Sequence, residues 1–260
     1  MTVKLTRLED VHSPELGNRR DVVVALPPSY GDGDVRYPVV YMHDGQNLFD
    51  PATSYAGDWK LRDTLIAHAA NGIEAIAVAI PSMGEERKDE YGPFPDARHG
   101  GGRGQAHARF VVHTLKPLVD REFRTRAGSA DTAIAGSSLG GLLSLYSFLT
   151  YPATFGAVAA LSPSLWFARG AIFRWARGRR FGSGRVYLDV GGREPPRAAR
   201  DARRMRDLLA SNGYVPGATL AYVEDPDGGH DEASWARRFR AAFPFLIAGR
   251  PVPQSAVDAA

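Results

Sequence analysis

The stretch from Asp131 to Gly141, Asp-Thr-Ala-Ile-Ala-Gly-Ser-Ser-Leu-Gly-Gly, constrains the fold more than any other part of this chain. A short apolar run ends in Gly-x-Ser-x-Gly and an apolar helical pattern follows at once, which predicts a strand, a tight turn and a helix with Ser138 at the apex. Gly136 and Gly140 leave room where the backbone turns sharply. The motif alone is common by chance, but its flanking strand and helix patterns indicate a nucleophile rather than an ordinary glycine-rich turn.

Apolar segments typical of strands alternate with helical patterns along almost the whole chain. We expect strands at residues 21–26, 37–42, 73–80, 132–135, 157–161, 185–190 and 219–224. We expect helices at residues 61–70, 104–123, 139–149, 197–210 and 232–247, the second of them kinked or broken at Pro117. This alternation predicts an α/β fold, a mainly parallel central sheet with helices on both faces. The carboxyl ends of parallel strands share one edge, where functional side chains gather.

The length of 260 residues suits a single domain that spans residues 1–260. Two segments interrupt the regular alternation, an irregular glycine-rich stretch at 81–104 and an aromatic, arginine-rich stretch at 162–184. Both are candidates for a small cap or lid, and surface excursions without a task are the alternative.

The composition excludes several classes of protein. The chain has no cysteine, so disulfides, thiolate metal sites and a cysteine nucleophile are ruled out. It shows neither a secretory h-region nor an apolar stretch of membrane-spanning length, and we therefore expect a cytoplasmic protein with no membrane partner. Arginines are concentrated between Arg169 and Arg206, and we interpret them as solvated helix faces because no nucleic-acid-binding motif accompanies them. No nucleic-acid partner is expected.

A serine nucleophile needs a base, and His230 is the only histidine that follows Ser138. It lies in a glycine-rich loop between the last expected strand and the last helix, which fits the chain order nucleophile, acid, base. Glu194 follows the strand at 185–190 after a Gly-Gly turn and is the favoured acid. A Ser-His dyad without an acid stays open, as do four other carboxylates: Asp189, Asp201, Asp225 and Asp227.

Acyl transfer through a serine also needs two N–H groups that bind the oxyanion. One should belong to Leu139, the residue after the nucleophile. The other should come from the loop at 41–50, where Gly45 allows close backbone approach and Gln46 is the best candidate donor. We expect the neighbouring His43-Asp44 pair to hold the shape of this loop rather than to react.

Several motifs together resemble the α/β-hydrolase family called Putative esterase, whose relatives include esterase D, enterochelin esterases, feruloyl esterases and the mycolyltransferases of the antigen 85 group. The similarity runs from about residue 5 to 247, and its most specific pieces are Asp-Gly-Gln-Asn-Leu-Phe at 44–49 and Ser-Pro-Ser-Leu-Trp at 162–166. The resemblance implies an α/β-hydrolase fold and no cofactor. It assigns Ser138 as nucleophile, His230 as base, Glu194 as acid, and Gln46 and Leu139 as oxyanion donors.

These observations predict a serine esterase that cleaves a small-molecule carboxylic ester through an acyl-enzyme on Ser138. An acyltransferase of the same fold and a non-catalytic binding module on a hydrolase scaffold are the alternatives. Trp166, Asp44 and Tyr91 are candidate substrate-binding residues, although aromatic side chains also serve as packing. The glycine run at 100–104 follows no strand, which argues against a dinucleotide site. The natural ester and the oligomeric state stay open.

Overall fold

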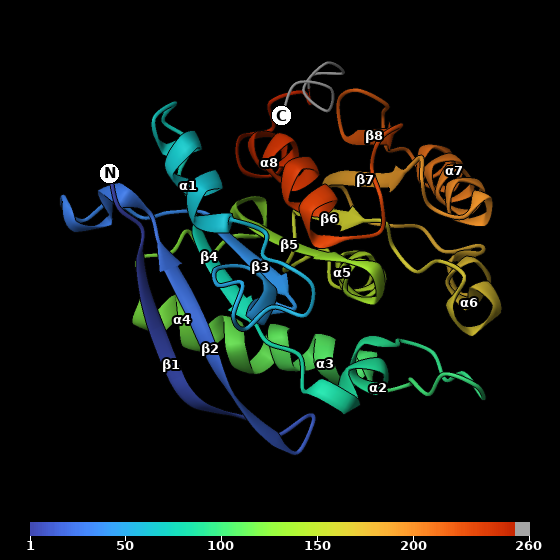
Figure 1. Cartoon of the computed structure of the whole chain (residues 1–260), viewed down its shortest axis with the longest axis horizontal. Coiled ribbons are helices and arrows are strands. Elements are labelled where there is room, and N and C mark those ends of the chain that lie inside the picture. Colours follow the sequence, from blue (N-terminus) through green and yellow to red (C-terminus); the bar gives the residue numbers. More distant parts are fainter. Residues whose placement is uncertain (253–260) are drawn as a thin grey trace.

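A computed structural model describes residues 1–252, which form one eight-stranded sheet in the order β1-β2-β4-β3-β5-β6-β7-β8 (Figure 1). The pairs β1/β2 and β2/β4 are antiparallel and all other neighbours are parallel. The strands are β1 Lys4–Ser13, β2 Asn18–Leu26, β3 Val39–His43, β4 Ile76–Ile80, β5 Thr132–Ser137, β6 Ala157–Leu161, β7 Arg185–Gly191 and β8 Leu220–Asp225. The expected α/β-hydrolase architecture is confirmed; of the expected single domain 1–260, residues 253–260 lie outside the described part.

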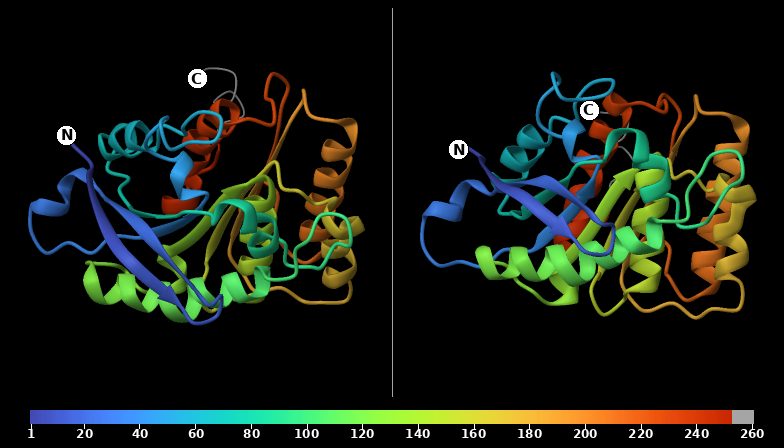
Figure 2. Two further views of the ribbon diagram at one scale, coloured as in Figure 1. Left: turned by 60° about the horizontal axis from the view of Figure 1, so that its bottom comes forward. Right: turned by 90° about the horizontal axis from the view of Figure 1, so that it is seen from below.

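Helices cover both faces of the sheet, as Figure 2 shows. They are α1 Leu61–Ala69, α2 Arg87–Tyr91, α3 Gly104–Arg109, α4 Lys116–Glu122, α5 Ser138–Thr150, α6 Phe167–Ala176, α7 Pro196–Ser211 and α8 Glu232–Ala248. One core contains residues of α4, α5, α6 and α7, and the other contains residues of α1 and α8. No helix within residues 1–252 is both long enough and apolar enough to cross a membrane.

The central strands have two different faces. Val78 and Ile134 point into the core under α5, whereas their neighbours Ala79 and Ala135 point into the core under α8. Alanine leaves space above the sheet, and large aromatic side chains of the α8 layer such as Phe239 fill it. The sheet is therefore buried on both sides, which explains the nearly continuous apolar strands in the sequence.

Of the kink or break expected at Pro117, the break is not found. The chain stays helical from α3 through a π-helical segment, Phe110–Leu115, into α4. Pro117 falls in the first turn of α4, where a residue without an N–H is tolerated, so the hydrogen-bonding pattern changes there but the helix does not end.

Strand β1 has no counterpart among the expected strands. It pairs with β2 only, at the edge of the sheet, and Val11 and Ser13 are its only buried residues. An edge strand of this kind carries little of the apolar alternation from which strands are predicted.

Candidate active site

Ser138 stands at the junction between β5 and α5. Its φ is +56°, a left-handed conformation that is strained for any residue except glycine and that recurs at functional sites. A Cβ on Gly136 would lie 2.7 Å from the Gly140 carbonyl, so only glycine allows the chain to turn this sharply. The junction places Ser138 in the first turn of α5, at the carboxyl edge of the sheet.

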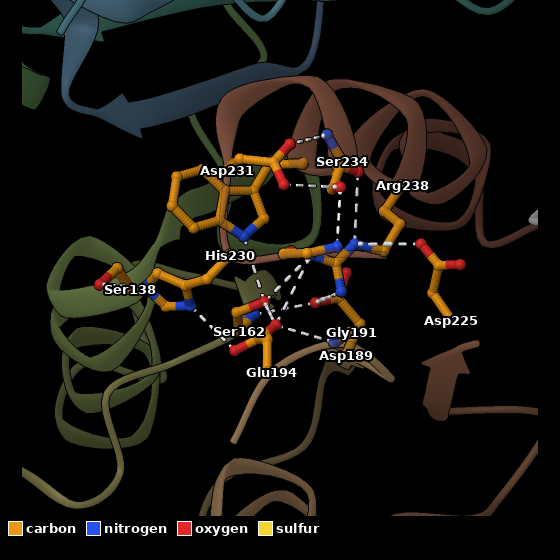
Figure 3. Close-up of polar contacts among 12 residues, drawn as sticks. Ser138, Ser162, Asp189, Gly191, Glu194, Asp225, His230, Asp231, Ser234 and Arg238 are labelled. Carbon is orange, nitrogen blue, oxygen red and sulfur yellow. Dashed lines mark hydrogen bonds and ion pairs between the residues drawn. The ribbon is translucent and has the colours of Figure 1, made fainter. Parts of the chain in front are cut away.

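The side chains of Ser138, His230 and Glu194 form one hydrogen-bonded row (Figure 3). His230 Nε2 lies 2.9 Å from Ser138 Oγ, and His230 Nδ1 lies 2.8 Å from Glu194 Oε2. Glu194 follows β7 and His230 follows β8, so all three residues come from carboxyl ends of parallel strands. This juxtaposition is the one that the sequence predicts.

The electrostatics of Glu194 set the tautomer of His230. Burial raises the pKa of Glu194, but hydrogen bonds from His230, Ser162 and the Gly191 N–H outweigh it and the net pKa is lowered. A carboxylate can only accept, so Nδ1 of His230 carries the proton and Nε2 is left to accept from the Ser138 hydroxyl. That is the tautomer a general base for Ser138 requires.

The other candidate acids are engaged elsewhere. Within residues 1–252, Glu194 is the only one of the five carboxylates with a hydrogen bond to His230. Asp189 is fully buried in β7, where burial raises its pKa to about 6 and its Oδ1 accepts the Ser162 N–H. The remaining three, Asp201, Asp225 and Asp227, are each paired with arginine.

Residues that the sequence analysis did not single out hold Glu194 in place. The Ser162 hydroxyl donates to Glu194 Oε1 at 2.5 Å and accepts from Trp235 Nε1 at 3.1 Å and from Arg238 Nη2 at 3.0 Å. The Gly191 N–H donates to the same oxygen at 2.8 Å. Ser162 belongs to the Ser-Pro-Ser-Leu-Trp motif at 162–166, and this motif was the feature of the sequence that could have pointed to it. A motif does not reveal which residues its side chains contact.

Arg238 on α8 is the charge at the centre of this support. Its guanidinium is completely buried and lies 3.2 Å from Asp189, 3.8 Å from Asp225 and 3.9 Å from Glu194. A buried cation must be paired, and here three carboxylates share one guanidinium. Helix α8 is thereby tied to the ends of β7 and β8, the two strands that present Glu194 and His230.

A second serine contacts Ser138. Ser164 Oγ lies 3.2 Å from Ser138 Oγ, and the Ser164 N–H donates to the Ser138 carbonyl at 2.9 Å. Ser164 is buried, so its hydroxyl is a fixed neighbour of the Ser138 oxygen. The edge of the Trp235 ring system packs against the His230 ring, with centroids 4.9 Å apart.

The loop after β3 packs against the start of α5. A Cβ on Gly45 would lie 2.6 Å from the backbone of Ala79, so only glycine lets the loop lie this close to β4. The side-chain amide of Gln46 is bonded to Ser82, with Oε1 accepting the Ser82 N–H at 3.0 Å and Nε2 donating to its hydroxyl at 3.1 Å. These bonds anchor the Gln46 side chain to the segment after β4. Leu139 occupies the first turn of α5, whose N–H groups have no partner inside the helix.

Asp44, within this loop, and Tyr91, which packs against it, are both buried rather than on an open surface. Tyr91 is fully buried, and its hydroxyl accepts the Asp44 N–H at 2.9 Å. The Asp44 carboxylate forms a bidentate ion pair with Arg87, whose Nε and Nη2 donate to Oδ1 and Oδ2 at 2.6 and 2.7 Å. A Cβ on Gly140 would come within 3.2 Å of Asp44 Oδ2, so this ion pair borders the first turn of α5.

A further buried ion pair supports Tyr91 from behind. Arg20 and Glu90 are both inaccessible to solvent and lie 2.9 Å apart. Burial raises the pKa of Glu90, but its contacts with His107 and Arg20 outweigh burial and lower the pKa to about 2. The ring of His107 stands edge-on to that of Tyr91 at 5.3 Å, which links the ion pair to the loop.

Trp166, the third candidate substrate-binding residue, is placed differently. It is 38% exposed, immediately precedes α6, and its ring stands edge-on to that of His99 with centroids 5.4 Å apart. Of the three candidates it is the one with a large exposed side chain.

Comparisons with known proteins agree with this architecture. The family described as Putative esterase matches residues 13–246. The Bacillus subtilis protein YbbA is 29% identical over 184 residues, 68% of this chain and 70% of that protein. A siderophore triacetylfusarinine C esterase of Aspergillus fumigatus is 32% identical over 146 residues, 54% of this chain and 48% of that protein.

A solved structure of the enterobactin esterase from Shigella flexneri superposes with a TM-score of 0.73 at 21% identity. The match covers 95% of this chain and 59% of the Shigella chain. This chain therefore spans about half to three fifths of these two esterases, and at this identity the structural match shows the shared fold.

Proposed function

Because the chain belongs to the Putative esterase family, we propose that it hydrolyses a carboxylic ester of a small molecule through a covalent intermediate on Ser138. The observation that carries the proposal is the row from Ser138 Oγ through His230 to Glu194, with hydrogen-bond distances of 2.9 and 2.8 Å. The fungal and Shigella relatives are named for esters of siderophores, which are small molecules, and this supports a substrate of that size.

In the first half of the reaction, His230 Nε2 takes the proton of the Ser138 hydroxyl while Oγ attacks the ester carbonyl carbon. The carbonyl π electrons move to oxygen and form a tetrahedral oxyanion. When the oxyanion collapses, the bond to the alcohol oxygen breaks and the alcohol leaves with the proton from His230. The acyl group stays on Ser138, and Glu194 stabilises the transient imidazolium.

In the second half, His230 takes a proton from water as the water oxygen attacks the acyl-enzyme. The second oxyanion collapses, Ser138 Oγ leaves and recovers its proton from His230, and the carboxylic acid is released. Ester and water are thereby converted to acid and alcohol with no other reactant. In both halves the N–H groups of Gln46 and Leu139 would bind the oxyanion. Gln46 lies in the loop after β3 and Leu139 in the first turn of α5, and both positions suit this task.

The test is hydrolysis of a p-nitrophenyl ester series of increasing acyl length, with Ser138→Ala and His230→Ala purified alongside. We expect turnover in the parent and a loss of several orders of magnitude in kcat in both variants. A fluorophosphonate should label Ser138 in the parent, and peptide mass spectrometry should locate it there.

Two results would redirect the proposal. Faster p-nitrophenol release with an added alcohol, together with formation of the new ester, would make the protein an acyltransferase. Well-folded parent protein with no turnover and no labelling at Ser138 would refute a serine esterase and leave a binding module.

A further inference from the structure

The two irregular segments of the chain meet beside the active site and enclose an open pocket of about 630 Å³. Residues 95–99 of the first segment form one side, and Arg197 at the start of α7 lies at the pocket too. The second segment contributes Trp166, Ala168, Arg169 and Arg174. Figures 1 and 2 both show the loop between α2 and α3 reaching towards α6. The glycines of this loop pack on Phe167, because a Cβ on Gly101 would lie 2.8 Å from its ring.

A short stretch of chain connects the pocket to Ser138. Ser164 contacts the Ser138 hydroxyl at 3.2 Å, and the exposed Trp166 is two residues further along the chain. Two residues of extended chain span at most about 7 Å. A substrate whose ester carbonyl sits at Ser138 can therefore place an adjoining ring on Trp166 and extend into the pocket.

The lining is strongly basic. Four guanidinium groups border the pocket, those of Arg98, Arg169, Arg174 and Arg197, against one carboxylate, that of Asp96. Asp96 already accepts hydrogen bonds from two backbone N–H groups and from the His99 ring. Among the described residues, neither Arg98 nor Arg169 has an acidic partner, whereas Arg197 is paired with Asp201 at 3.2 Å. Guanidinium groups without counter-charge favour an anionic occupant.

The backbone that carries Arg169 is held in a strained conformation. Ala168, Arg169 and Gly170 have φ values of +49°, +55° and +69°, a left-handed turn that is costly for the first two residues. Arg174 donates to the carbonyls of Arg169 at 2.9 Å and Ala168 at 3.2 Å, which keeps the turn in place. The arginine side of the pocket is thus a built feature rather than a chance gathering of surface side chains.

We propose that this pocket binds a carboxylate on an aromatic part of the substrate, with the ring on Trp166 and the carboxylate between Arg98 and Arg169. A planar guanidinium matches a carboxylate in charge and geometry, and an indole face offers a stacking surface. The inference rests on the proposed esterase function and narrows its substrates to aromatic esters that bear a negative charge. The segments 81–104 and 162–184 then act as the walls of a specificity pocket.

Matched pairs of substrates test the preference for a negatively charged aromatic ester. In one pair the carboxylate is on the alcohol part, and in the other it is on the acyl part. On the alcohol side we would compare para-acetoxybenzoate with para-acetoxybenzamide. On the acyl side we would compare the p-nitrophenyl half-ester of terephthalic acid with p-nitrophenyl para-carbamoylbenzoate. For each pair the measurement is the ratio of kcat/KM for the anion to that for the amide. Comparing this ratio between proteins cancels the intrinsic reactivity of the two esters.

We expect Arg169→Gln and Arg98→Gln each to lower the ratio about tenfold for at least one pair. This is the effect of losing one charge about 4 Å from the carboxylate at an effective dielectric of about 60, as suits an exposed site. Arg169→Lys should retain part of the preference. Arg177→Gln is the control, because Arg177 is an exposed arginine of the same segment that does not line the pocket. About 1 M salt should reduce the parent ratio, since exposed charges are then screened within about 3 Å.

Equilibrium binding separates this inference from the esterase proposal. Calorimetry with Ser138→Ala protein should show benzoate binding more tightly than benzamide, and Arg169→Gln in that background should abolish the difference. This result would support the pocket even if no ester were turned over. Kinetic ratios that do not change in either arginine variant, together with equal binding of benzoate and benzamide, would overturn the inference while leaving turnover of neutral esters intact.

Discussion

Replacing Ser162 by alanine should impair both stability and catalysis, although its side chain is hydrogen-bonded to neither Ser138 nor His230. Its hydroxyl joins three buried groups: it donates to Glu194 at 2.5 Å and accepts from Trp235 at 3.1 Å and Arg238 at 3.0 Å. Alanine removes all three bonds and leaves an indole N–H and part of a guanidinium buried without an acceptor.

The magnitudes follow from those bonds. A buried donor left without a partner costs about 1–3 kcal/mol, and more where a charge is involved. Arg238 Nη2 still donates to the Gly229 carbonyl at 3.2 Å, so the guanidinium contributes less to the loss of stability than a donor with no acceptor left. We therefore expect Ser162→Ala to lower the free energy of unfolding by about 3 kcal/mol. Glu194 keeps its bond from the Gly191 N–H at 2.8 Å, so kcat should fall about tenfold rather than the roughly 10⁴-fold seen when a triad acid is removed.

The pH profile separates positioning from simple destabilisation. The Ser162 bond helps to lower the pKa of Glu194, so its removal raises that pKa. Protonation of Glu194 then begins at a higher pH, and the acid limb of kcat should shift upwards in the variant. A loss of stability without an effect on the carboxylate would leave the limb where it is.

The assay is urea unfolding together with kcat between pH 4 and 9 for the parent, Ser162→Ala and Ser147→Ala. Ser147 is a matched control, because it is equally buried and its hydroxyl has no hydrogen-bond partner among the described residues. Its replacement should be neutral or slightly stabilising in helix α5. A Ser162→Ala protein with kcat within twofold of the parent and an unmoved acid limb would refute a positioning role.

Three further changes have defined outcomes. Tyr91→Phe removes the acceptor for the Asp44 N–H and should lower kcat about tenfold with little change in KM. An unchanged kcat would show that Tyr91 does not support the loop after β3, which carries Gln46. The pKa of Glu90 is lowered to about 2, so its contacts with His107 and Arg20 stabilise the fold above the unfolded pKa of about 4.3. That stability is about 3 kcal/mol in full, and about half of it is lost between pH 5 and pH 3, so urea unfolding at these two pH values should show a larger fall in the parent than in Glu90→Gln. Arg238→Met leaves the buried carboxylate of Asp189 without its cation, whereas Asp225 keeps Arg237, and should cost about 3–5 kcal/mol in urea unfolding; a cost under about 1 kcal/mol would mean that the cluster does not depend on the guanidinium.

The sequence could predict the juxtaposition of Ser138, His230 and Glu194 because parallel strands bring their carboxyl ends to one edge. That rule needs only the order of strands and the residue types in the loops that follow them. The choice of Glu194 over the other carboxylates rested on its position after a strand, and the hydrogen bond to His230 agrees with that choice.

The support around Glu194 could not be predicted in the same way. Whether Arg238 faces the sheet depends on the rotation of α8, and amphipathic periodicity treats an arginine as a surface residue. The burial of Tyr91 could not be predicted either, since a tyrosine suits a binding site and a core equally well. The basic pocket was also hidden in the sequence, because only the fold brings Arg98 beside Arg169.

The contacts of Arg238 also bear on the time at which activity arises. During synthesis Ser138 leaves the ribosome well before Arg238, whose guanidinium stabilises the loops that carry Glu194 and His230. A nascent chain can therefore complete β5 and the first turns of α5 while its serine is still inert, because no base has yet been delivered to it. Esterase turnover in a refolding mixture would accordingly report that α8 has docked onto the sheet, because only then does Arg238 contact the carboxylates at the ends of β7 and β8.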